Sequence, residues 1–99
     1  MKQFVEVHYY VRPGMRQAFY DALSESGIPA ASRAEAGNVQ YDYYFSPEQE
    51  DELLLLELWQ DAEAVRLHGE TPHFKALGTL KAEFVTETVI RRFELSETL

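Results

Sequence analysis

The segment from Glu52 to Trp59 constrains the fold most, because it is apolar on both faces of an extended strand. Its sequence, Glu-Leu-Leu-Leu-Leu-Glu-Leu-Trp, places leucines on either side of the backbone. Such a strand is expected to be central in a sheet and covered twice. A chain of 99 residues buries only about two-thirds of its unfolded surface and has little chain left for a second covering layer. We therefore expect a second copy to cover one face of the sheet.

Three further strands are predicted by alternation of apolar and β-branched residues with polar ones. They cover residues 4–11, 39–46 and about 84–93. Apolar residues at helical spacing from Met15 to Leu23 predict an amphipathic helix that Gly27 ends. A short helical piece at 29–36 follows it.

Two more helices are predicted from their capping residues. Asp61 is a candidate N-cap for a helix over 62–68, and Thr71-Pro72 indicates the start of a helix to about Ala82. The resulting order, β-α-β-β-α-β, is that of the ferredoxin-like α+β fold, with an antiparallel sheet and helices on one face. We expect residues 1–99 to form a single domain.

The composition excludes several classes of partner. Nine basic and seventeen acidic residues give a net charge of −8, which disfavours nucleic acid and anionic lipid. Cysteine is absent, so no disulfide or thiolate site is available. The first residues lack the apolar core of a signal peptide, and the aliphatic run Leu53 to Leu56 is too short to cross a membrane. We expect a cytoplasmic protein that binds no nucleic acid and no membrane.

Trp59 and Glu57 are candidate site residues because they share one face at the end of a strand. The indole of Trp59 can line a cavity and donate its N–H, or it can be a core residue. Glu57 either binds a polar group of a ligand or is satisfied by an arginine or a histidine.

Three histidines offer acid–base chemistry. His68 is the leading candidate for a general base, because imidazole titrates near neutral pH. His73, in the first turn of the next helix, is expected to be neutral and suited to hydrogen bonding with a ligand, and capping or packing is the alternative role. His8 lies on the more polar face of the first strand and is a further ligand-contact candidate. Because Gly69 separates His68 from His73, their spacing does not match a zinc motif, and we expect no metal.

Asn38 and Tyr41 form a second candidate group after Gly37. Gly37-Asn38 is a tight entry into a strand, whereas Tyr41 belongs with Tyr9, Tyr10 and Tyr43 to a tyrosine-rich set that could stack on a flat aromatic ligand. The glycines are dispersed and form no phosphate loop, so no nucleotide or flavin cofactor is expected.

Two motif blocks carry a resemblance to a known family. They are Glu-x-Trp-x-Asp-x-x-Ala-x-x-x-His-x-x-Thr-Pro-His-Phe over 57–74 and Glu-x-Gly-Asn-x-x-Tyr-Asp over 35–42. Both blocks resemble the antibiotic biosynthesis monooxygenase (ABM) superfamily, which includes small quinol monooxygenases. The resemblance extends from about Val5 to Phe93. It implies a dimeric α+β barrel and cofactor-independent oxidation of a small phenolic or quinol-type substrate by O₂.

Two other functions stay open at this stage. One branch with a similar Gly-Asn and Thr-Pro-His pattern isomerises a small phosphorylated carbonyl compound, which would require a phosphate-binding cation such as Arg12 or Arg33. The other alternative is a non-catalytic dimer that binds a small ligand.

Overall fold

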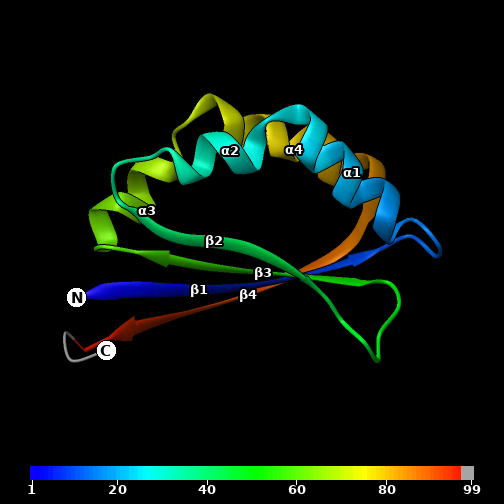
Figure 1. The fold of residues 1–99 in the computed structure, drawn as a ribbon, viewed down its shortest axis with the longest axis horizontal. Coiled ribbons are helices and arrows are strands. Elements are labelled where there is room, and N and C mark those ends of the chain that lie inside the picture. Colours follow the sequence, from blue (N-terminus) through cyan, green and yellow to red (C-terminus); the bar gives the residue numbers. More distant parts are fainter. Residues whose placement is uncertain (97–99) are drawn as a thin grey trace.

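The computed structural model describes residues 1–96, which form four strands and four helices (Figure 1). The strands are β1 (Lys2–Val11), β2 (Asn38–Phe45), β3 (Glu52–Trp59) and β4 (Val85–Leu95). The helices are α1 (Arg16–Ser26), α2 (Ile28–Arg33), α3 (Ala62–His68) and α4 (Pro72–Phe84). This order confirms the predicted ferredoxin-like fold, with the helical part of each connection divided into two helices.

One antiparallel sheet contains all four strands in the order β2-β3-β1-β4. β1 and β3 are therefore internal strands. In the register of the sheet, Glu57 lies opposite both Val5 of β1 and Tyr41 of β2. The neighbouring pair on the same face is Val7 with Ile90 of β4. This register gathers Glu57, Tyr41 and apolar β1 side chains on one face of the sheet.

The helices cover that face only (Figure 1). Burial along β1 and β3 alternates strictly, and the fully buried side chains belong to the helix-covered face. Phe19 and Leu23 of α1 pack onto this face. Leu53 and Leu55 of β3 lie on the face itself and belong to the same buried core. The hydrophobic core thus lies between the sheet and the helices.

Two glycines permit the connections between these layers. Gly27 ends α1 with φ of 80°, a left-handed conformation that a side chain disfavours. At Gly37, a Cβ atom would lie 2.3 Å from the Cβ of Ala64 in α3. The absence of a side chain at Gly37 therefore lets the start of β2 pass against α3.

Side-chain caps fix the starts of α3 and α4. A carboxylate oxygen of Asp61 accepts a hydrogen bond from the backbone N–H of Ala64, at 2.8 Å. The hydroxyl of Thr71 accepts one from the N–H of Phe74, at 3.1 Å. Both caps were predicted from the sequence, and they determine where His68 and His73 leave the backbone.

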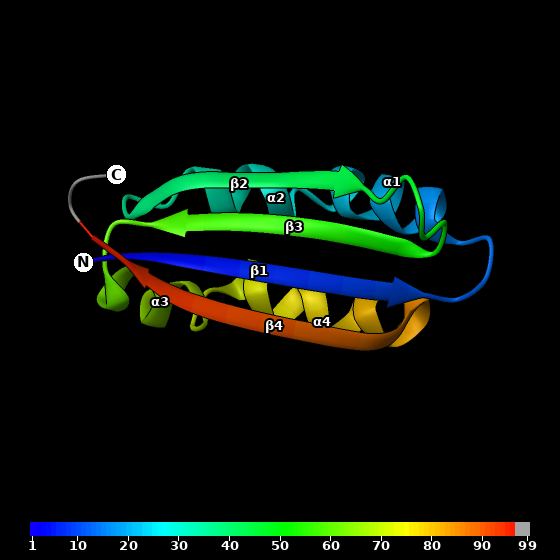
Figure 2. The same ribbon diagram turned by 90° about the horizontal axis from the view of Figure 1, so that it is seen from below.

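The second face of the sheet has no covering layer within the described residues (Figure 2). Leu54, Leu56 and Leu58 of β3 are half-buried there, while Tyr44 and Phe93 are exposed. Thus β3 has apolar side chains on both faces, as predicted, but residues 1–96 cover only one of them. No helix within residues 1–96 has the length and apolar character needed to span a membrane.

Candidate active site

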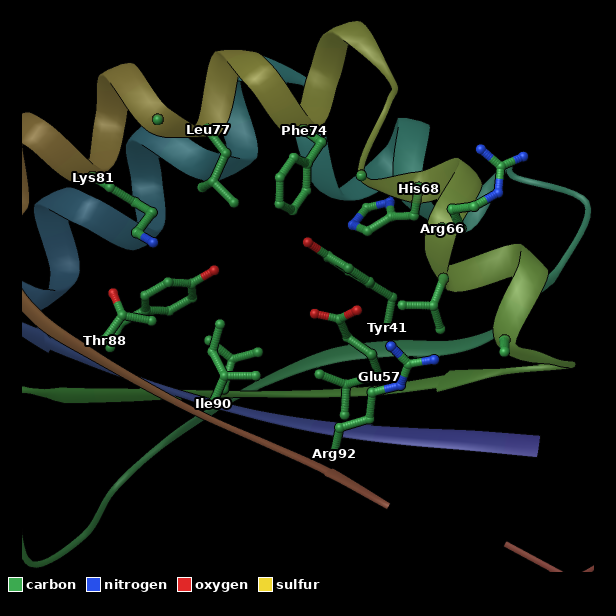
Figure 3. A pocket seen from close by; sticks show the side chains of 17 residues that line it. Tyr41, Glu57, Arg66, His68, Phe74, Leu77, Lys81, Thr88, Ile90 and Arg92 are labelled. Atoms are coloured by element: carbon green, nitrogen blue, oxygen red, sulfur yellow. The ribbon is translucent and has the colours of Figure 1, made fainter. Parts of the chain in front are cut away.

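A cavity of about 660 Å³ lies between the sheet and helices α3 and α4 (Figure 3). Its walls are largely apolar, and their apolar side chains include Val5, Val7, Val65, Phe74, Leu77 and Ile90. The polar groups that reach it come from the sheet, from α3 and from α4, and include Tyr41, Glu57, His68 and Lys81. A volume of this size suits one small organic molecule.

His68 is held at the cavity wall by a carboxylate from another part of the chain. Its Nδ1 lies 2.6 Å from Oε2 of Glu35, which is in the turn between α2 and β2. Nε2 of His73, from the first turn of α4, lies 2.8 Å from the same oxygen. The fold therefore joins Glu35, His68 and His73, which come from three separate segments, into one cluster.

The hydrogen bond with Glu35 determines which nitrogen of His68 can act as a base. An ionised carboxylate only accepts hydrogen bonds, so in the neutral form of His68 the proton is on Nδ1 and the free lone pair is on Nε2. Within residues 1–96, no buried side-chain nitrogen or oxygen lacks a partner, and no hydrogen bond to this Nε2 is found. Nε2 is therefore accessible, and the cavity that His68 lines is the space it faces.

Aromatic rings surround the imidazole and restrict its rotation. The centre of the His68 ring is 4.6 Å from that of Trp59, 5.2 Å from Phe74 and 6.0 Å from Tyr41. Only 5% of His68 is exposed. The predicted candidate base is thus both a lining residue and a packed one, and its replacement by a small residue would also leave a void.

Trp59 lies behind the cavity wall. It is completely buried and is not among the lining residues. Its Nε1–H donates to Oε1 of Glu57 at 2.8 Å, so the indole donor that we expected to serve a ligand is already used. The partner of Glu57 is therefore this indole rather than an arginine or a histidine. In the structure Trp59 supports both His68 and Glu57.

Glu57 is the carboxyl group that lines the cavity. Burial raises the pKa of Glu57 to about 7, and the hydrogen bond from Trp59 offsets this only in part. Near neutral pH a substantial fraction of Glu57 is therefore protonated and can donate a hydrogen bond. A carboxyl group in this state can bind a developing oxyanion.

Replacing Glu57 by Gln should make stability less dependent on pH. The pKa of Glu57 in the folded state is raised from 4.5 to about 7. Its contribution to the free energy of unfolding is therefore most favourable below pH 4.5 and is lost as the pH rises through 7. The loss amounts to about 3 kcal/mol at most. Urea denaturation at pH 5 and pH 8 should show that Glu57→Gln gains stability relative to wild type at the higher pH. An equal difference at both pH values would contradict the assignment, and the exposed Glu83→Gln is the control.

The four tyrosines of the tyrosine-rich set lie in different environments. Tyr9 and Tyr41 line the cavity, whereas Tyr43 packs edge-on against Tyr20, and Tyr10 stacks on His8 on the other face of the sheet. Burial raises the pKa of Tyr41 to about 12 and that of Tyr9 well above its ordinary value. Both cavity phenols therefore remain protonated hydrogen-bond donors.

Two other predicted ligand contacts lie away from the cavity. The side chain of Asn38 donates to the backbone oxygen of Gln40 and shapes the entry into β2. His8 faces the uncovered side of the sheet, because it alternates with the buried Val7 and Tyr9. There it lies 2.6 Å from Glu52 and 2.8 Å from Glu6, and these hydrogen bonds, chiefly that with Glu52, raise its pKa. Neither residue lines the cavity.

The cluster of Glu35, His68 and His73 also has the donor set of a metal site. One atom from each residue lies within 4.8 Å of the others, and within residues 1–96 no other group of this kind is found. Two imidazoles and one carboxylate suit a divalent transition metal. The expectation of no metal was based on the spacing of His68 and His73 in the sequence. It did not take Glu35 into account as a third ligand. In the arrangement described here, hydrogen bonds join the same three groups.

The arginines considered for phosphate binding do not reach the cavity. Arg12 donates to the backbone oxygen of Glu83, and Arg33 of α2 donates to that of Tyr41. Neither is a lining residue. The expectation that one of them would bind a phosphorylated substrate in this cavity has no structural support.

Glu35 is the site residue to which the sequence assigned no role. It lies in the block Glu-x-Gly-Asn and is separated by 33 residues from His68 and by 38 from His73. Only its place at the start of that block could have drawn attention to it.

Comparison with known proteins identifies close relatives over nearly the whole chain. The family model described as antibiotic biosynthesis monooxygenase matches residues 3–79. The Bacillus subtilis protein named "Putative monooxygenase YcnE" is 35% identical over 95 residues, which cover 94% of this chain and 97% of that protein.

Solved structures share the fold described above. A "putative antibiotic biosynthesis monooxygenase" from Caulobacter crescentus superimposes with a TM-score of 0.85 and 25% identity, covering 97% of this chain and 91% of that chain. A conserved protein from Methanosarcina mazei gives a TM-score of 0.86 with 27% identity, over 97% of this chain and 94% of the other.

Proposed function

Because the chain belongs to the antibiotic biosynthesis monooxygenase family, we propose that it oxidises a small phenolic or quinol-type substrate with O₂ and without a cofactor. The observation that carries this proposal is the hydrogen bond between Glu35 and His68. It orients the imidazole and, in the neutral form of the ring, leaves the lone pair on Nε2 at the wall of a largely apolar cavity. An oriented, neutral imidazole next to a dry space is what proton removal from a phenol requires.

The proposed reaction begins with proton transfer from the phenol to Nε2 of His68. The phenolate is electron-rich enough to reduce O₂ itself, and a carbon of the ring forms a bond to one oxygen atom. His68 returns its proton to the distal oxygen, which gives a ring hydroperoxide. Loss of water from this hydroperoxide yields a quinone. One phenol and one O₂ thus give one quinone and one water.

The other cavity groups fit the charges that develop in these steps. Glu35 stabilises the imidazolium while His68 holds the proton. Tyr41 and protonated Glu57 are donors for the phenolate oxygen or for peroxide oxygen. The apolar side chains of β1, β4 and α4 exclude water, which strengthens these interactions.

Oxygen consumption by chelator-treated protein tests the proposal. A panel of quinols and catechols should include at least one compound that the protein oxidises faster than the buffer does. Isotope-labelled O₂ should place one labelled atom in the product and release no hydrogen peroxide. If activity appears only after a divalent metal is added back, the cluster of Glu35, His68 and His73 is a metal site and the cofactor-independent proposal is wrong.

We also propose that two copies pack through the uncovered face of the sheet, which is the arrangement expected from the sequence. Leu54, Leu56 and Leu58 form an apolar row on this face, and Tyr44 and Phe93 extend it. Leu56→Glu should convert a dimer into a monomer, because each interface would bury two unpaired carboxylates. Sedimentation velocity at micromolar concentration is the measurement, and the exposed Leu67→Glu on α3 is the control. A wild-type protein that sediments as a folded monomer would contradict this arrangement.

A further inference from the structure

We propose that the end of the cavity around Lys81 binds an anionic group, so that the substrate is a phenol with a carboxylate at the far end of its ring system. This inference rests on the proposed function, because it takes His68 as the site of the reacting hydroxyl. It adds a substrate class, which neither the family membership nor the role of His68 as the base determines.

The charge of the cavity is opposite to that of the protein. The chain has a net charge of −8, yet three of its nine basic residues, Arg66, Lys81 and Arg92, line the cavity. Glu57 is the carboxyl group among the lining residues, and it is partly protonated near neutral pH. A cavity with excess positive charge attracts anions even when the rest of the surface repels them.

Lys81 is the lining cation without an ionic or hydrogen-bonded partner in residues 1–96. Arg66 forms ion pairs with Glu63 and Glu70. Arg92 donates to the side-chain oxygen of Gln3 at 2.9 Å. By contrast, Lys81 is partly buried, its Nζ lies 5.8 Å from the centre of the Tyr9 ring, and no carboxylate of the described residues lies within ion-pair distance of it.

Two hydroxyl groups lie at the same end of the cavity. Figure 3 draws Thr88 of β4 and Lys81 at the same end of the cavity, and the register partner of Thr88 is Tyr9, whose ring centre lies 5.8 Å from Nζ of Lys81. Tyr9 is only 3% exposed, but no hydrogen bond from its hydroxyl is found in the described part of the chain. Since no buried polar side-chain atom there lacks a partner, this hydroxyl is accessible from the cavity. One ammonium and two hydroxyl donors are a suitable set for a carboxylate.

The length of α4 between the two ends sets the approximate scale of the ligand. Figure 3 shows His68 and Lys81 at opposite ends of the cavity, with Phe74 and Leu77 between them along α4. Phe74 contacts His68, with ring centres 5.2 Å apart. From Phe74 to Lys81, seven helical residues rise about 10 Å. This length matches a fused two-ring aromatic acid whose hydroxyl and carboxylate point in opposite directions.

A carboxylate is favoured over a phosphate ester because Lys81 is a single cation at its end of the cavity, whereas Arg92 is the register partner of Val5 near Glu57 (Figure 3). A phosphate monoester carries close to two negative charges at neutral pH, and burial of the second would be costly without another cation. The arginines considered for phosphate binding lie elsewhere.

Titration calorimetry with three matched ligands tests the inference. The ligands are a hydroxynaphthoate with its hydroxyl and carboxylate at opposite ends, its primary amide, and the corresponding hydroxynaphthyl phosphate. Wild-type protein should bind the acid roughly tenfold more tightly than the amide, the factor expected from one charge-assisted contact. The phosphate ester should bind more weakly than the acid.

Lys81→Met keeps the aliphatic stem against Tyr9 and removes only the charge. It should weaken binding of the acid roughly tenfold and change that of the amide by less than about twofold. Lys75→Met is the matched control, because Lys75 is an exposed lysine of the same helix that does not line the cavity. Lys81→Arg should retain the preference for the acid.

The possible results separate the two proposals. Equal affinity of wild-type protein for acid and amide, or an equal effect of Lys81→Met on both, would overturn the anionic subsite. Tighter binding of the phosphate ester than of the acid would also overturn the carboxylate assignment and would favour the isomerase alternative. The expected binding pattern without any O₂ consumption would support the subsite and overturn the oxidation chemistry.

Discussion

Replacing His68 by Gln should lower the turnover number for the oxidation by roughly 10²- to 10⁴-fold, which is the usual contribution of a general base. Glutamine can keep a hydrogen bond to Glu35 through its amide N–H, but it cannot accept the proton of a phenol. Steady-state O₂ uptake with a confirmed substrate is the measurement. Gln is preferable to Ala, because His68 packs against Trp59 and a void there would reduce stability.

His8→Gln is the matched histidine control. His8 lies on the opposite face of the sheet, so its loss should change turnover per folded molecule by less than about twofold even if stability falls. Wild-type turnover by a folded His68→Gln protein would exclude His68 as the base.

Replacing Glu35 by Gln should reduce turnover by roughly 10²-fold or more while the Michaelis constant changes little. Glu35 does not line the cavity, so it acts as a positioning residue through His68. A neutral amide can present its N–H₂ to Nδ1, which favours the tautomer with the proton on Nε2 and removes the base. The imidazolium formed in the reaction would also lose its counter-charge.

Rescue separates this role from a merely structural one. Glu35→Asp retains a carboxylate and should recover a measurable part of the lost turnover, although its shorter side chain has to serve both His68 and His73. Urea denaturation of both variants provides the stability comparison. If Gln and Asp at this position reduce turnover equally and in proportion to the loss of folded protein, Glu35 has only a structural role.

The sequence predicted the elements better than the contacts between them. The strand from Glu52 to Trp59 and the helix ended by His68 were predictable because their signals are local: alternation of side chains, and caps such as Asp61. The placement of His68 at a cavity also followed, since a strand end and a short helix bring it near the sheet.

Contacts that depend on the packing of distant segments were not predictable. The bond between Glu35 and His68 joins the turn after α2 to the end of α3, and its formation depends on how α3 packs beside β2. Trp59 has the strand position of a cavity residue, but the layer of helices covers it completely. His8 was a reasonable candidate by residue type, yet the orientation of β1 turns it to the uncovered face.

Side chains alternate strictly between the two faces of the sheet along β1. A change in the length of this strand therefore affects the cavity and the uncovered face at the same time. Val7 and Tyr9 point into the cavity, whereas His8 and Tyr10, which alternate with them, point to the other side. Insertion or deletion of a single residue in β1 would exchange these two sets, placing His8 in the cavity away from Glu52 of β3 and the buried Tyr9 outside it. Substitutions can adjust either face, but changes of length in this strand would alter the cavity and the uncovered face together. Diversification in length is therefore expected in the loops of this fold, while the central strands keep their register.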